Sequence, residues 1–257
     1  MVLFLLLITP SAPSLAQEIT CASPVVLDAV NARLHKNALV RNTTLKEKSI
    51  LDVSVSFSKV SNSVMRQDKS LTCWASAALK VDPNVTQLLS SENLKYSLVA
   101  QQIVADYLPS SAVNLTENNE DSLSFAGFQY DVFANDDGTL KEVDFDAHDR
   151  SSYAIYGIAW FNENAKIIKN EMIKNAFSEA KEDFTRADDN INTLYSALPE
   201  LIQHNLRGEM RNWIKQKDRK CGKVELLATA DISLTEKTKI YRCQTEMTAM
   251  QIERLTE

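Results

Sequence analysis

The hydrophobic pattern of the chain changes its period at about Tyr153, and this change constrains the fold more than any other feature. Before that residue, several segments alternate apolar and polar side chains, as a half-buried β-strand does. They predict about five antiparallel strands, over residues 50–57, 71–81, 94–104, 128–133 and 140–145. The last two flank Asn135-Asp136-Asp137-Gly138, a sequence typical of the turn in a β-hairpin.

Helical periodicity characterises one early segment and most of the chain after Tyr153. Residues 24–40 place apolar side chains at helical spacing, as do residues 165–184, 187–198, 201–220 and 235–255. Residues 148–164 are rich in aromatic side chains, which favours a packed junction over a loose linker. We therefore expect an α+β protein with a small N-terminal domain of one helix on an antiparallel sheet (residues 17–150), followed by a C-terminal all-α helical bundle (residues 151–257).

The first sixteen residues have the pattern of a signal peptide. They carry no charged side chain, and a continuous apolar run precedes Pro10 and Pro13, with small residues up to Ala16. We expect cleavage after Ala16, because Ser14-Leu15-Ala16 supplies the small residues that a signal peptidase requires. The apolar run is shorter than the about 20 residues that a transmembrane helix needs. Later apolar runs are all interrupted by charge, so no transmembrane anchor is expected. The chain is predicted to be periplasmic or secreted.

The four cysteines fit a disulfide-bonded protein of an oxidising compartment. None forms a C-x-x-C pair of the kind found in zinc or redox sites. Cys21 and Cys73 lie in the predicted α+β domain, and Cys221 and Cys243 lie near the C-terminus. Four cysteines allow three pairings, and the sequence alone does not choose among them. We favour Cys21–Cys73 and Cys221–Cys243, because each bridge would then lie within one domain.

The charge of the chain is acidic, with a net charge of −6 and a pI near 5.3. Nucleic-acid binding requires a basic face, so a nucleic-acid partner is not expected. An acidic chain attracts a basic protein partner and speeds the encounter with it. The same charge also serves solubility alone.

No motif of catalytic or cofactor chemistry is present in the sequence. The three histidines, His35, His148 and His204, are far apart and lack the spacing of metal ligands. No nucleotide-binding glycine loop or nucleophile elbow occurs, and the turn ending at Gly138 lacks the first ligand of a calcium loop. We expect no catalytic residue, cofactor or metal, although a pair of carboxylates suited to polymer hydrolysis would not be visible in sequence.

Three segments of the C-terminal third resemble the lysozyme-inhibitor LprI-like family. Residues 187–195 are similar to the family's A-D-x-x-L-N-x-x-Y opening, through Asp188, Asn192 and Tyr195. Trp213, Arg219 and Cys221 are similar to its W-I-x-x-R-D-x-x-C helix, with the Arg-Asp order reversed. Cys243 and Arg254 are similar to its closing C-x-x-x-x-T-x-x-R pattern. The resemblance covers residues 187–255, and the N-terminal half is not explained by it.

The resemblance implies a small, exported, helical domain, some relatives of which inhibit lysozyme. We therefore expect a non-catalytic binding protein that inhibits a lysozyme-type muramidase, which is a basic partner. The motif side chains Asp188, Asn192, Tyr195, Trp213, Arg219 and Arg254 are expected to be structural. Two polar loops, residues 110–122 and 135–138, are candidates for blocking the muramidase cleft. The alternatives are an envelope-polymer hydrolase with a hidden carboxylate dyad and a non-catalytic envelope scaffold.

Overall fold

The structure is a computed structural model, and it describes residues 19–41, 44–62, 70–108, 122–145, 151–228 and 231–256. The chain forms two compact units. The first, here called the sheet unit, consists of the chain up to Thr86 together with Ile103–Glu163. The second, the helical unit, consists of Gln87–Gln102 and Asn164–Glu257. The predicted signal peptide (residues 1–16) and His148 lie outside the described residues.

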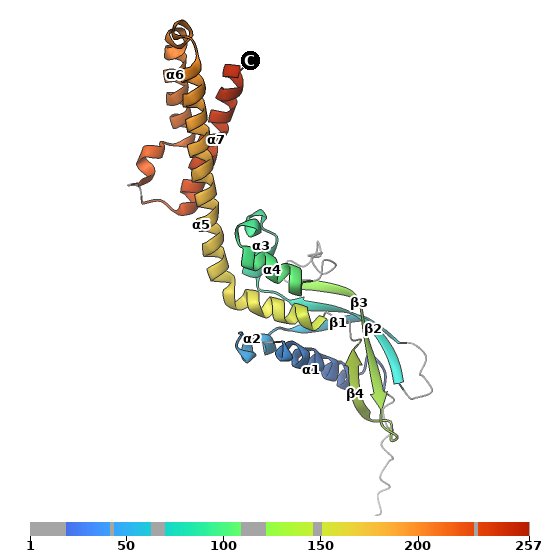
Figure 1. Cartoon of the computed structure of the whole chain (residues 1–257). Helices are drawn as coiled ribbons and strands as arrows, with labels where there is room; N and C mark the ends of the chain where they lie inside the picture. Colours follow the sequence, from blue (N-terminus) through green and yellow to red (C-terminus); the bar gives the residue numbers. More distant parts are fainter. Residues whose placement is uncertain are drawn as a thin grey trace, which may run out of the picture. The chain divides into compact units, whose positions relative to one another are not determined.

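The sheet unit is built on a four-stranded antiparallel sheet with the order β1-β2-β3-β4 (Figure 1). Its strands are β1 (Val55–Asn62), β2 (Ser70–Lys80), β3 (Ser122–Ala134) and β4 (Leu140–Phe145). Two helices precede them, α1 (Pro24–Val40) and α2 (Glu47–Leu51). Described strands number four rather than the expected five, because the segment predicted as the third strand is helical.

The core of the sheet unit lies between α1 and one face of the sheet. Alternate residues of β2 are buried from Cys73 to Leu79, while Trp74 and Lys80 are exposed. A disulfide joins Cys73 to Cys21, directly before α1, and the Tyr130 hydroxyl donates a 2.8 Å hydrogen bond to the Cys21 carbonyl oxygen. The buried stripe of α1 has helical spacing and consists of Val26, Val30, Leu34, His35 and Ala38.

The expected strand over residues 94–104 is wrong. The chain forms α3 (Pro83–Leu89), a 3₁₀ turn η1 (Glu92–Tyr96) and α4 (Leu98–Tyr107) in this region. The Ser97 hydroxyl accepts a hydrogen bond from the Ala100 N–H, which caps α4 at its N-terminus. The apolar run misleads because Ala100 is buried, whereas Leu98 and Val99 are exposed.

The strand expected over residues 50–57 begins later than predicted. Ile50 belongs to the short helix α2, and β1 starts at Val55. Ile50 and Val53 are both buried and lie three residues apart, a spacing that places two side chains on one face of a helical turn but on opposite faces of a strand.

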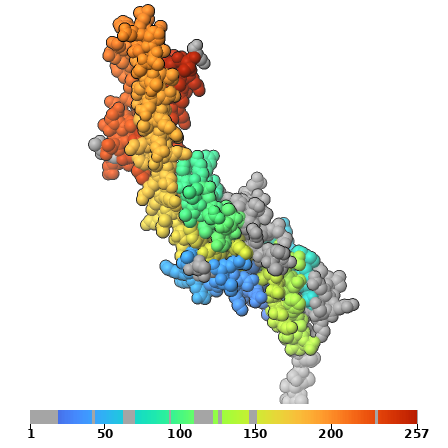
Figure 2. Space-filling view, in the orientation of Figure 1, coloured from blue at the N-terminus to red at the C-terminus, as the bar shows by residue number. Residues whose placement is uncertain are grey.

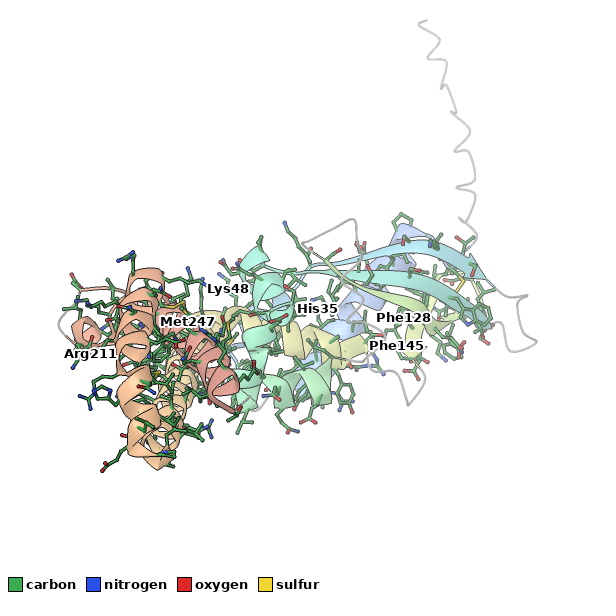
Figure 3. The ribbon with its side chains drawn as sticks, turned by 90° about the horizontal axis from the view of Figure 1, so that it is seen from above. His35, Lys48, Phe128, Phe145, Arg211 and Met247 are labelled. Atoms are coloured by element: carbon green, nitrogen blue, oxygen red, sulfur yellow. A yellow bond between two sulfur atoms is a disulfide. The ribbon has the colours of Figure 1, made fainter. Side chains whose placement is uncertain are left out.

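The predicted hairpin is confirmed between β3 and β4. The Asn135 N–H donates to the Thr139 carbonyl oxygen at 2.8 Å, and Gly138 has a φ of +82°, which a glycine adopts without strain. Figure 3 shows Phe128 and Phe145 beside each other on this hairpin, with ring centroids 5.4 Å apart.

Helix α5 (Ser151–Ala197) is a single helix of 47 residues. Its first turns belong to the sheet unit and bury an apolar, aromatic-rich stripe, as the composition of residues 148–164 predicts. Gly157 lies within this stripe, where a Cβ atom would come within 3.0 Å of the side chains of Tyr107 and Leu108. The buried residues here are Ala154, Ile155, Tyr156, Ile158, Ala159 and Phe161.

The helical unit combines the remainder of α5 with α6 (Glu200–Cys221), a 3₁₀ turn η2 (Val224–Ala228) and α7 (Leu234–Thr256). Pro199 precedes α6, as its fixed φ favours, and Gly222 ends α6 with a φ of +95°. The predicted class is confirmed: an antiparallel sheet with a helix is followed by a long helical region.

Candidate functional site

The core of the helical unit begins with a cluster of aromatic and aliphatic side chains. Tyr241 of α7 packs between two rings of α5, with centroids 5.8 Å from Phe177 and 5.4 Å from Phe184. Ala180 and Leu227 are buried in the same cluster. The Cys221–Cys243 disulfide joins the end of α6 to α7. This bridge and Cys21–Cys73 are the pairing that the sequence analysis favours, and no free cysteine remains.

A polar layer lies in the same bundle and is centred on Lys217. This lysine is 5% exposed, and its Nζ donates to the Thr248 hydroxyl at 3.3 Å. The ammonium also lies over two aromatic rings, 4.7 Å from the Trp213 centroid and 5.6 Å from that of Phe184. Burial lowers the pKa of Lys217, while the negative charges of Asp188, Asp218 and Glu225 oppose this shift.

Gln244 completes this layer from α7. Its side-chain N–H groups donate to the Gly222 carbonyl oxygen at 2.5 Å and to an Asp218 carboxylate oxygen at 3.4 Å. The Thr248 hydroxyl donates to the Gln244 carbonyl oxygen at 2.8 Å. Since burying a polar group is costly unless it is hydrogen-bonded, these contacts make the buried layer tolerable.

The motif side chains of the LprI resemblance lie at different places in the unit. On α5, Asn192 donates to the Asp188 carboxylate at 3.2 Å, and Asp188 acts electrostatically on Lys217. Trp213 of α6 is nearly buried against the same lysine, so Asp188 and Trp213 adjoin the polar layer. Arg219 is exposed on α6.

The other two motif residues join helices. The Tyr195 hydroxyl donates to the Gln203 carbonyl oxygen at 2.7 Å and thereby fastens the turn between α5 and α6. Arg254 of α7 pairs with Glu209 of α6 at 3.1 Å, with both side chains mostly exposed. None of these contacts forms a catalytic arrangement among the described side chains.

The turn between α5 and α6 exposes apolar side chains. We call residues 188–209 the hairpin tip; Asp188 and Glu209 lie about equally far from the turn on the two antiparallel helices. Leu201 is 72% exposed and Ile202 41% exposed. Figure 2 shows this turn, in orange, extending beyond the end of α7, in red. The Gln203 amide closes the turn by donating to the Leu198 carbonyl oxygen at 2.7 Å.

Charge is distributed unevenly between the two units and within the helical unit. The sheet unit has 11 basic and 18 acidic residues, a net charge of −7, whereas the helical unit has 17 basic and 16 acidic residues, a net charge of +1. Within the hairpin tip, four acidic residues accompany one basic residue, Arg207, which gives a net charge of −3. The tip is thus an acidic, partly apolar end of a nearly neutral unit.

Of the two loops expected to block a cleft, only one is described. Residues 135–138 form a tight turn in which the hydroxyl and the backbone N–H of Thr139 lower the pKa of Asp137. Residues 109–121, which make up nearly all of the other loop, lie outside the described part.

No group of three or more potential metal ligands gathers among the side chains that the structure describes. His35 is buried between the carbonyl oxygens of Asn31 and Val53, and His204 is exposed on α6. Within the described ranges, no helix is both long and apolar enough to cross a membrane.

Sequence reasoning overlooked the polar layer and its centre, Lys217. A signal was present, because Leu206, Met210, Trp213 and Lys217 follow one another at helical spacing, which places the lysine on the buried face of α6.

Residues 169–255, the C-terminal third of the chain, match the family model described as "Lysozyme inhibitor LprI". The match confirms the resemblance expected from sequence and begins 18 residues earlier, on α5. It leaves the N-terminal half unassigned. No curated protein and no solved structure matches the chain significantly.

Proposed function

We propose that this chain is an exported, non-catalytic protein whose helical unit binds and inhibits a lysozyme-type muramidase. The observation that carries the proposal is the match of residues 169–255 to the lysozyme-inhibitor family. Export to the periplasm or the cell exterior is part of the proposal. Two disulfides support it, since such bonds persist in oxidising compartments.

We place the muramidase contact at the hairpin tip. Its exposed Leu201 and Ile202 offer apolar area to a partner, and the fully buried core of a protein interface is more apolar than the rest of the surface. The segment's net charge of −3, of which Arg254 of α7 offsets one unit through its ion pair with Glu209, favours a basic enzyme, because complementary charge steers the encounter and suppresses wrong partners.

The test is a turbidity assay that follows the lysis of cells with a peptidoglycan wall by a basic muramidase. The purified chain is added in increasing amounts. We expect inhibition that persists at physiological salt. The double variant Leu201→Ser/Ile202→Ser, which removes the apolar side chains without changing the charge, should weaken inhibition by about tenfold or more.

The matched control is Ile214→Ser, which changes an isoleucine of the same helix outside the tip. Ile214 is 46% exposed, close to the value for Ile202, so its replacement perturbs the helix to a similar degree. Inhibition that suffers equally from both changes would reject the tip as the contact, and unchanged lysis at excess wild-type chain would reject the function itself.

The same assay addresses the two alternatives. Lysis caused by the chain alone, without muramidase, would favour a hydrolase of envelope polymers. If the chain causes no lysis and no inhibition, the result favours an envelope scaffold. Co-purification from envelope extracts would then identify the partner of that scaffold.

A further inference from the structure

The helical unit contains a groove of about 450 Å³ that none of the motif residues lines. Its walls come from α5, from the start of α7 and from residues 87–91. The volume lies in the range of about 300–1,000 Å³ that is usual for small-molecule sites.

The floor of this groove is apolar. Met172 and Ala176 of α5 and Leu88 of α3 line it and are buried, and Ile173 adjoins them. Thr238 of α7 also lines it, but its hydroxyl already donates to the Leu234 carbonyl oxygen at 2.8 Å within the helix. The floor therefore suits an alkyl chain better than a polar ligand.

The rim of the groove is cationic. Lys169 of α5 and Lys239 and Arg242 of α7 are among the described residues that line it, and all three are exposed. No aspartate or glutamate is among the lining residues that the structure describes. The groove thus joins an apolar floor to a rim of positive charge.

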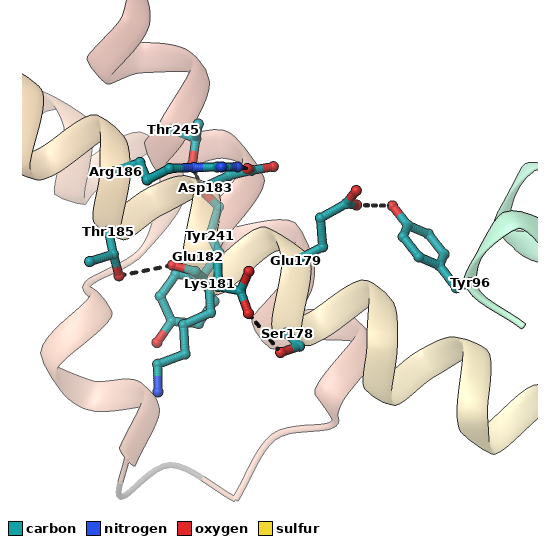
Figure 4. A network of polar contacts seen from close by, with 10 residues as sticks. All are labelled: Tyr96, Ser178, Glu179, Lys181, Glu182, Asp183, Thr185, Arg186, Tyr241 and Thr245. Carbon is teal, nitrogen blue, oxygen red and sulfur yellow. Dashed lines mark hydrogen bonds and ion pairs between the residues drawn. The ribbon is translucent and has the colours of Figure 1, made fainter.

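Three carboxylates that adjoin groove residues in sequence or through hydrogen bonds, Glu171, Glu179 and Glu236, already have partners. The Tyr96 hydroxyl donates to Glu179 (Figure 4), and Arg242 donates to the Tyr96 oxygen at 3.0 Å, which holds the guanidinium in place. Glu171 accepts a hydrogen bond from the Ser97 hydroxyl at 2.8 Å. Lys239 pairs with Glu236 at 3.4 Å, but both side chains are largely exposed, so this pair is weak.

We propose that this groove binds an amphipathic anion, with its alkyl chain on the apolar floor and its carboxylate or phosphate head group among Lys169, Lys239 and Arg242. Burial of the chain provides a non-directional driving force, and the three cations select for negative charge. A free fatty acid and a lipid phosphate share this chemistry. The proposal does not rest on muramidase inhibition.

The test is isothermal titration calorimetry of the full chain with dodecanoate and with dodecyl phosphate, each below its micelle-forming concentration. Dodecyltrimethylammonium, which has the same alkyl chain and the opposite charge, is the ligand control. We expect saturable binding of at least one anion and binding of the cation that is at least about tenfold weaker. Binding of only one anion would assign the head group as carboxylate or as phosphate.

The variant Lys169→Glu/Lys239→Glu should weaken anion binding at least about tenfold, because two of the three cations are reversed. Both lysines are exposed, so the fold should tolerate the change. Lys174→Glu, at an exposed lysine of α5 that does not line the groove, is the matched control and should leave binding unchanged. Absence of anion binding, equal binding of the cation, or equal effects of the two variants would overturn the proposal.

Discussion

The sheet unit and the helical unit stabilise their cores in different ways. In the sheet unit, α1 and the first turns of α5 bury mostly apolar side chains, and the buried polar contacts include the Tyr130 hydroxyl on the Cys21 carbonyl oxygen and the His35 ring between the carbonyl oxygens of Asn31 and Val53. In the helical unit, a layer containing Lys217, Gln244 and Thr248 runs through the bundle. The sheet unit also carries all of the net negative charge, because the helical unit has a net charge of +1.

The comparison separates the source of the overall charge from the region that matches the inhibitor family. A net charge of −6 for the whole chain suggests general attraction to a basic partner, but the family-matched region has a net charge of +1, which becomes +4 when the acidic tip is left out. The proposed muramidase contact therefore depends on local charge at the hairpin tip. The buried titratable groups of the two units, Tyr130 in the sheet unit and Lys217 in the helical unit, also predict opposite changes in stability at alkaline pH.

The largest expected effect concerns the two disulfides. Cys21–Cys73 closes a sequence separation of 52 residues and Cys221–Cys243 one of 22. Restriction of the unfolded chain then predicts that Cys21→Ala/Cys73→Ala lowers the free energy of unfolding of the sheet unit by about 4 kcal/mol, and Cys221→Ala/Cys243→Ala that of the helical unit by about 3 kcal/mol. Hydrogen exchange followed by mass spectrometry reports each unit through its own peptides. Equal destabilisation of both units by either pair would show that the units unfold together.

A smaller effect is expected from Tyr130 in the sheet unit. Burial raises the pKa of Tyr130 to about 12, from 10.0. Above pH 10 the unfolded chain loses this proton while the folded chain keeps it, so the sheet unit loses stability between pH 10 and 12. The loss amounts to about 2–3 kcal/mol.

Tyr130→Phe provides the comparison for this measurement. It removes the titrating group and the hydrogen bond to Cys21, so stability should be lower near pH 7 and fall less steeply above pH 10. Denaturant unfolding at a series of pH values measures both slopes. Parallel curves for wild type and variant would contradict the assignment to Tyr130.

The smallest effect is expected from Lys217 in the helical unit, with the opposite sign. Burial lowers the pKa of Lys217, so the unfolded chain binds more protons as the pH approaches 10.5, and the helical unit gains stability with rising pH in that window. Lys217→Met keeps the volume and removes the buried charge. We expect Lys217→Met either to lower the free energy of unfolding by no more than about 1 kcal/mol or to raise it. The variant should also lose this pH dependence.

The control for Lys217→Met is Lys215→Met, at an exposed lysine of the same helix, which should leave the pH dependence intact. A loss of more than about 2 kcal/mol for Lys217→Met would instead show that the buried lysine is a net stabiliser.

The sequence predicts most of the fold where a single local signal decides the structure. The β3–β4 hairpin follows from Gly138 and its turn, and the end of α6 follows from Gly222, because both positions need a positive φ. It fails at residues 94–104, where the hydroxyl of Ser97 caps a helix although the neighbouring side chains are mostly apolar. The capping residue favours a helix and the apolar run favours a strand, and tertiary burial, here that of Ala100, decides between the two.

The family match of the C-terminal third was accessible from sequence, but the sites were less so. Lys217 could have been identified from its place on the buried face of α6. The groove could not, since it brings Leu88 together with Ala176 and Thr235, which are far apart in the chain. The acidic charge of the hairpin tip can be counted from the sequence alone, once the turn before Pro199 is known.

Both disulfides join cysteines that are neighbours in the order of the chain. When a polypeptide enters an oxidising compartment from its N-terminus, Cys73 is the first partner that Cys21 meets, and Cys243 is the first unpaired thiol to follow Cys221. The native connectivity is therefore also the one that sequential oxidation produces. Maturation of this protein should need an oxidant but little help from a disulfide isomerase.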